Sequence, residues 1–91
     1  MERLIPIWEK YCEAPWPGGT GPHEGELMTL DSVITGCVRD FLADTKLHSH
    51  RIEILKNCVS ELDTLLPELE GEGRDYFNRL QELGEMLLKG N

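Results

Sequence analysis

The chain lacks several features that would point to a membrane or nucleic-acid protein. No apolar run approaches the length that crosses a bilayer, and no basic segment followed by an apolar stretch opens the sequence. Basic residues are scarce, since nine Lys and Arg stand against seventeen Asp and Glu, for a net charge of −8. Because phosphate binding requires clustered cations, we expect no direct contact with nucleic acid and none with a membrane. We expect a soluble, unprocessed protein.

Cysteine is also scarce. Cys12, Cys37 and Cys58 are the three present, and no pair has the C-x-x-C spacing. An odd number without that spacing argues against a disulfide framework and against a zinc site. Each cysteine falls in the apolar phase of an expected helix, where a thiol behaves as a small buried hydrophobe. We therefore expect free thiols and a cytoplasmic protein, with a Cys37–Cys58 disulfide across a helical hairpin as the alternative.

Recognisable catalytic and cofactor patterns are missing as well. The glycines of residues 18–21 are not followed by the lysine that a phosphate-binding loop requires. Ser49 stands between His48 and His50 but is expected to be a solvated turn residue, and Cys58 lies eight residues after His50, too far for a hydrogen bond within one helix. We therefore expect no enzyme, no cofactor and no metal. The alternative is a small metal- or ligand-binding protein, in which folding brings His23 and Glu24 to His48 and His50.

What the sequence does contain is helical periodicity. Apolar residues recur at helical spacing near residues 4–12, 30–41, 52–66 and 73–89, and residues 15–25 between the first two segments are rich in Pro and Gly. These patterns predict one all-α domain over residues 1–91. We expect a small antiparallel bundle of four helices, with a short first helix, a long loop 15–25 and three longer helices.

Two helix boundaries are ambiguous in the sequence. The second helix begins either at Pro22 or after Thr29, which would then serve as its N-cap. Residues 44–50 contain neither Gly nor Pro, but a helix continued through them would turn polar side chains toward the apolar face. We favour a turn there. One continuous helix over residues 30–66 is the alternative, and it implies a homodimer that covers its apolar face.

Gly84 interrupts the helical pattern, and Trp16 is the one large aromatic residue of the loop 15–25. Gly84 lies inside the last apolar stripe, where Gly costs about 1 kcal/mol relative to Ala. We expect a bulky side chain to need that space, with Trp8 or Trp16 as candidates. Trp16 stands between Pro15 and Pro17, so it is either a binding anchor on a rigid loop or a ring folded back onto the core.

Acidic residues cluster at the expected connection between the third and fourth helices, with Arg74 as their only base. The cluster comprises Glu61, Asp63, Glu68, Glu70, Glu72 and Asp75.

From this cluster and the missing catalytic patterns we hypothesise a non-enzymatic interaction or regulatory protein that binds another macromolecule, with a basic protein as its partner. The candidate contact residues are Trp16, Glu68, Glu70, Glu72 and Asp75. In size and charge alone the chain resembles nuclease immunity proteins and phage-encoded inhibitors, which implies that inhibition of a basic enzyme is one form of this hypothesis. A structural homodimer is the second hypothesis.

Overall fold

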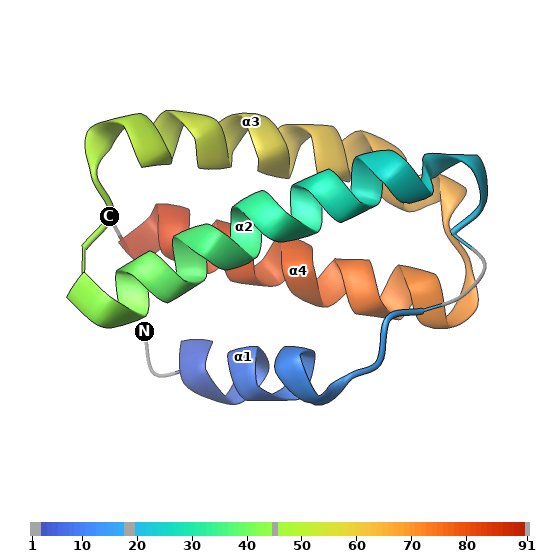
Figure 1. Cartoon of the computed structure of the whole chain (residues 1–91), viewed down its shortest axis with the longest axis horizontal. Helices are drawn as coiled ribbons and strands as arrows, with labels where there is room; N and C mark the ends of the chain where they lie inside the picture. The colour runs from blue at the N-terminus through green and yellow to red at the C-terminus, as the bar shows by residue number, and fades with distance from the viewer. Residues whose placement is uncertain (1–2, 18–19, 45, 91) are drawn as a thin grey trace.

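The computed structural model describes residues 3–17, 20–44 and 46–90. Its four α-helices are α1 (Leu4–Glu13), α2 (Glu24–Asp44), α3 (Ser49–Leu65) and α4 (Gly71–Gly90). As Figure 1 shows, the three long helices pack side by side and the short α1 lies along α4. The predicted all-α bundle of four helices is confirmed. Among the described residues, no helix is both long enough and apolar enough to cross a membrane.

The ends of α1 and the start of α2 follow from their prolines. Helix α1 ends at Glu13, ahead of Pro15, because a residue that precedes proline is disfavoured in helical geometry. A 3₁₀ turn containing Pro22 leads directly into α2. The earlier of the two predicted starts is therefore right, and the prediction of Thr29 as N-cap is wrong. Thr29 lies inside α2, where its hydroxyl donates to the Gly25 carbonyl.

The junction between α2 and α3 is a turn, so the continuous helix over residues 30–66 is excluded. Helix α2 ends at Asp44 and α3 begins at Ser49. Between them Leu47 is only 2% exposed, which shows why the chain leaves helical geometry here: the turn buries an apolar side chain that a continuous helix would not. Arg51 and Asp40 then form an ion pair of 3.0 Å across the junction. Residue 45 lies outside the described residues.

The second connection is short. Helix α3 ends at Leu65, and Pro67 lies in a 3₁₀ turn over Leu66–Glu68. Helix α4 begins at Gly71, two residues earlier than its apolar stripe suggested, and Gly71 adopts a φ of +59° that favours glycine. Helix α4 extends to Gly90.

The core lies between α2, α3 and α4, and α1 covers one side of it. Cys37 is fully buried and Cys58 is half-buried, but Cys12 is exposed, contrary to expectation. Tyr11 takes the inward position on α1 and thereby turns its neighbour outward. All three thiols are free. The largest fully buried side chains are Phe77, Leu4, Leu27, Ile34, Leu55, Leu62, Leu80, Leu83 and Leu87.

Gly84 lies where α4 packs tightly against α3. A Cβ atom built on Gly84 would lie 2.6 Å from Cγ2 of Val59. The expectation that Trp8 or Trp16 fills this space is therefore wrong, because a side chain of the neighbouring helix already occupies it. Small residues at such a crossing let two helices pack closely.

We predict that Gly84→Ala destabilises the protein by about 1–3 kcal/mol, the usual cost of overpacking a core. Val59 cannot easily rotate away, because a β-branched side chain has one strongly preferred rotamer in a helix. Gly25→Ala is the matched control. Gly25 lies in α2, and a Cβ atom added there would have no neighbour within 4 Å. This substitution should therefore stabilise the protein by up to about 1 kcal/mol. Urea unfolding of the unmodified protein and of the two variants measures the change in unfolding free energy for each substitution. Equal changes in the two variants would contradict the prediction.

Candidate functional site

Helix α1 is attached to the bundle through the buried side chains of Leu4 and Tyr11. The Tyr11 hydroxyl donates a hydrogen bond to the Asp31 carboxylate on α2. The Tyr11 ring packs on Tyr76 of α4, with ring centroids 4.5 Å apart. These contacts fix the end of α1 and thereby the start of the loop that follows it.

Burial controls the chemistry of these two tyrosines. Burial, followed by the hydrogen bond to Asp31, raises the pKa of Tyr11 far above its ordinary value. Burial also raises the pKa of Tyr76. Both hydroxyls therefore stay protonated at neutral pH, where Tyr11 serves as a donor to Asp31. Neither phenol is suited to act as a general base.

The loop after α1 folds back onto α4. The Trp16 ring packs edge-on against Tyr76 and Phe77, with centroids 5.7 and 5.5 Å away. Its indole N–H lies 3.3 Å from a carboxylate oxygen of Glu24, to which it donates. Trp16 is nevertheless 39% exposed. The ring thus closes the core and also presents part of its surface to solvent.

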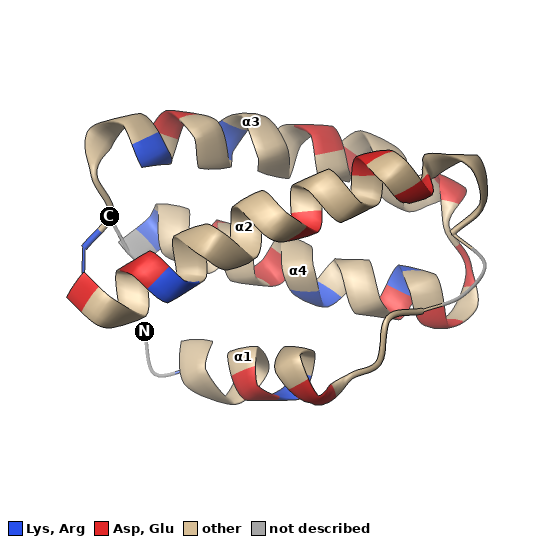
Figure 2. Ribbon diagram, in the orientation of Figure 1, with Lys and Arg blue, Asp and Glu red and all other residues tan. Residues whose placement is uncertain are grey.

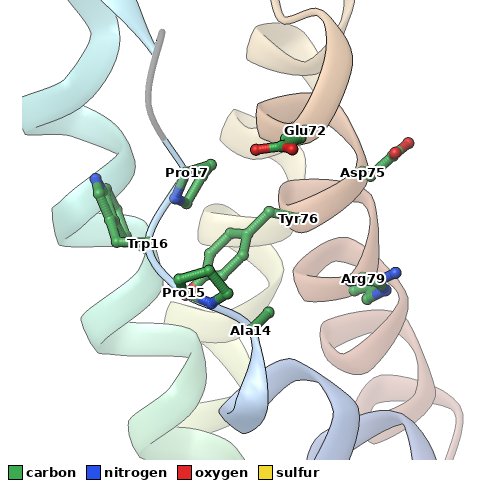
Figure 3. A pocket seen from close by; sticks show the side chains of 8 residues that line it. All are labelled: Ala14, Pro15, Trp16, Pro17, Glu72, Asp75, Tyr76 and Arg79. Atoms are coloured by element: carbon green, nitrogen blue, oxygen red, sulfur yellow. The ribbon is translucent and has the colours of Figure 1, made fainter.

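A groove of about 250 Å³ lies between this loop and α4, and we call it the Trp16 groove. One wall consists of residues 14–17, and the other consists of four side chains of α4 (Figure 3). Glu72 and Asp75 form no hydrogen bond or ion pair with any other side chain that the structure describes. The groove therefore combines an apolar wall with two carboxylates that are free to bind a cation. The α4 residues that line it are Glu72, Asp75, Tyr76 and Arg79.

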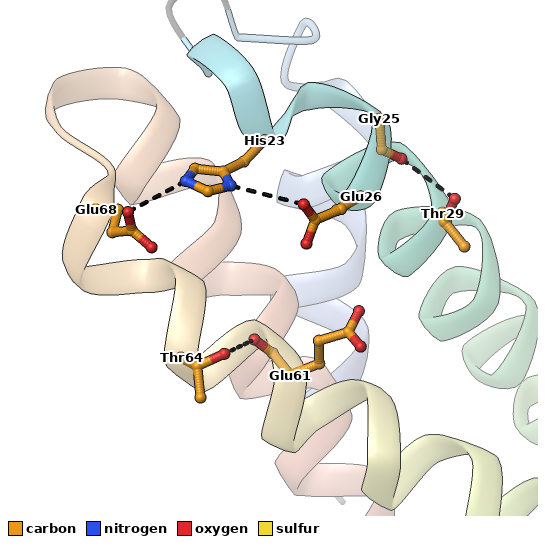
Figure 4. Close-up of polar contacts among 7 residues, drawn as sticks. All are labelled: His23, Gly25, Glu26, Thr29, Glu61, Thr64 and Glu68. Atoms are coloured by element: carbon orange, nitrogen blue, oxygen red, sulfur yellow. Dashed lines mark hydrogen bonds and ion pairs between the residues drawn. The ribbon is translucent and has the colours of Figure 1, made fainter.

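Acidic side chains gather at the end of the bundle that contains this groove, as Figure 2 shows. The start of α2 lies there beside the α3–α4 connection. His23 joins the two segments, with Nε2 3.2 Å from Glu68 and Nδ1 3.8 Å from Glu26 (Figure 4). We call this surface the acidic end, and it comprises Glu24, Glu26, Glu68, Glu70, Glu72 and Asp75.

The structure brings three of the five predicted contact residues into one groove. Trp16 lies there with Glu72 and Asp75, although it is far from both in the sequence. Glu68 is partly engaged by His23, and Glu70, two residues further along the chain, is exposed. The sequence analysis missed Glu24 and Glu26, which the early start of α2 places at the same end. Their position beside the Pro- and Gly-rich loop was the available signal.

The other members of the predicted acidic cluster have different surroundings. Asp63 accepts a hydrogen bond from the Gln81 side-chain amide at 3.2 Å, which links α3 to α4. The Glu61 carbonyl accepts a hydrogen bond from the Thr64 hydroxyl within α3 (Figure 4). These two acids lie along α3 rather than at the connection itself.

The histidines proposed as alternative ligands are not brought together. His23 lies at the acidic end, whereas His48 and His50 lie at the α2–α3 junction, at the opposite end of the bundle (Figure 1). Within residues 3–17, 20–44 and 46–90, no group of three His, Cys, Asp or Glu side chains is arranged to hold a metal ion. Gly18 and Gly19 of the glycine-rich segment lie outside the described residues.

Comparison of the chain with protein-family models, with curated proteins and with solved structures finds no match.

We predict that Tyr11→Phe lowers the stability at pH 7 by about 1–2 kcal/mol, because Asp31 loses its hydrogen-bond donor. The loss should shrink at alkaline pH. Above about pH 10 an unfolded tyrosine releases its proton, whereas Tyr11 keeps its proton when folded, so the stability contributed by Tyr11 falls as the pH rises.

Urea unfolding at pH 7, 10 and 11 measures both effects. The stability of the unmodified protein should fall more steeply between pH 10 and 11 than that of Tyr11→Phe. Equal slopes in the two proteins would contradict the assignment of Tyr11.

Proposed function

We propose that this chain is a non-enzymatic interaction protein that binds a basic protein partner through the acidic end of the bundle. The observation that carries the proposal is that two segments identified separately as candidate contact sites lie side by side in the folded chain. The Trp16 loop and the acidic α3–α4 connection form one surface, which joins a partly exposed aromatic ring to unpaired carboxylates. Aromatic anchors surrounded by polar groups are typical of protein interfaces.

The distribution of charge supports a basic partner. Several cations lie toward the opposite end, among them Lys46, Arg51 and Lys89 (Figure 2), so the field of the −8 chain is directional. Such a field steers a partner of opposite charge and increases the association rate, an effect that salt screens. A basic protein would therefore approach the acidic end preferentially.

Two of the three thiols, Cys37 and Cys58, are poorly suited to nucleophilic chemistry. Burial raises the pKa of Cys37, an effect that Arg51 partly offsets. Burial and the nearby Glu61 raise the pKa of Cys58. A protonated, buried thiol is a poor nucleophile, because the thiolate is the reactive form.

We predict that Glu68→Lys combined with Glu70→Lys weakens binding of the partner at least tenfold. The matched control is Glu9→Lys combined with Glu53→Lys, which changes the net charge by the same amount on exposed positions of α1 and α3. The control should weaken binding by less than about threefold, because its charges lie away from the acidic end.

The partner is first captured from a lysate at low salt on the immobilised chain and is then purified for calorimetry with each variant. Circular dichroism verifies that both double variants fold. A purified partner that binds both double variants equally would overturn the proposal, as would the failure to capture any partner whose binding weakens with salt.

The homodimer hypothesis can be tested separately. Its first basis, a continuous helix over residues 30–66, is excluded by the turn before Ser49. We therefore predict a monomer in sedimentation equilibrium at high micromolar concentration, at both low and high salt. A stable dimer at both salt concentrations would instead favour the structural role.

A further inference from the structure

We infer that the Trp16 groove binds an arginine side chain of the partner. This inference depends on the proposed function and adds the chemical group that the acidic end recognises. The groove lies at the surface, and both of its walls are built from segments that the Tyr11 contacts hold in place.

The size of the groove favours a single side chain. Its volume of about 250 Å³ is below the roughly 300–1,000 Å³ that is typical of cofactor and drug-sized ligand sites. Its lining residues Pro15, Glu72 and Asp75 are exposed, so a side chain can enter the groove from solvent. A protruding residue of a partner protein fits these dimensions.

The charges in the groove favour a cation at one end. Glu72 and Asp75 are one helical turn apart on α4, and both are exposed and unpaired among the described residues. Figure 3 shows Glu72 near Pro17, whereas Arg79 lies at the Ala14 end. Repulsion from Arg79 disfavours a cation at that end, so the bound charge is directed toward Glu72.

The apolar and aromatic surfaces favour arginine over lysine. A guanidinium group is planar, binds a carboxylate through two hydrogen bonds and stacks on flat surfaces, whereas an ammonium is a strongly hydrated point charge. The Tyr76 ring lines the groove, and Figure 3 shows Pro17 as the proline nearest to Glu72. The same chemistry occurs elsewhere in this chain, since the Arg39 guanidinium lies 5.8 Å from the centre of the Trp8 ring.

The test is an NMR titration of the ¹⁵N-labelled chain with N-acetyl-arginine amide. We expect shifts centred on the Trp16 indole N–H and on the backbone of α4 around Tyr76, with millimolar affinity. N-acetyl-lysine amide should bind at least threefold more weakly. The citrulline analogue, which keeps the shape of arginine but carries no charge, should produce no saturable shift.

Two variants localise the effect. Glu72→Gln should raise the dissociation constant for the arginine probe about tenfold, because it removes the carboxylate that pairs with the guanidinium. Glu53→Gln, on the exposed side of α3, is the matched control and should leave the constant unchanged. Both positions are exposed, and an unperturbed spectrum of each free variant shows that it folds.

Three results would overturn the inference: no shift at tens of millimolar arginine probe, equal binding of the citrulline or lysine analogue, or an unchanged constant in Glu72→Gln. Such a result leaves the proposed function standing if partner binding still depends on Glu68 and Glu70. Conversely, if the arginine probe binds the groove but no partner depends on Glu68 and Glu70, the proposed function fails and the groove remains a cation site.

Discussion

The contact of Tyr11 with Asp31 and Tyr76 is the interaction on which the geometry of the Trp16 groove depends. Helix α1 has only 10 residues, and an isolated helix of that length is unstable in water. Its stability therefore comes from packing, and Tyr11 supplies both a ring contact to α4 and a hydrogen bond to α2. Because the loop that follows α1 forms one wall of the Trp16 groove, the geometry of the groove depends on this anchoring.

The carboxylates of the acidic end repel one another, and other interactions in the bundle must offset this repulsion. Carboxylates from the start of α2 and from the α3–α4 connection lie at the same end, where like charges destabilise the folded chain. His23 reduces part of this cost when it is protonated, because it lies between Glu26 and Glu68. Glu72 and Asp75 have no such partner among the described residues, so a bound cation would lower the remaining repulsion.

Several features of the fold were predictable because they depend on nearby residues. The apolar period identified the four helices, and Pro15 and Pro67 marked where α1 and α3 end. Other features depended on tertiary contacts. Burial of Leu47 selects the turn before α3. The exposure of Cys12 follows from the inward position of its neighbour Tyr11. The space at Gly84 could be anticipated from its place in a stripe, but its occupant, Val59, depends on how α3 and α4 cross.

The sequence by itself determined the helical class, the excess of negative charge and the clustering of acidic residues, because periodicity and composition are properties of the chain alone. The predicted antiparallel order already placed the first and third connections at one end, but it did not determine which of their side chains would meet. Only the tertiary structure placed Trp16 beside Glu72, because the packing angles of the helices decide those contacts. The groove exists because residues distant in the chain pack together, and no local pattern encodes that proximity.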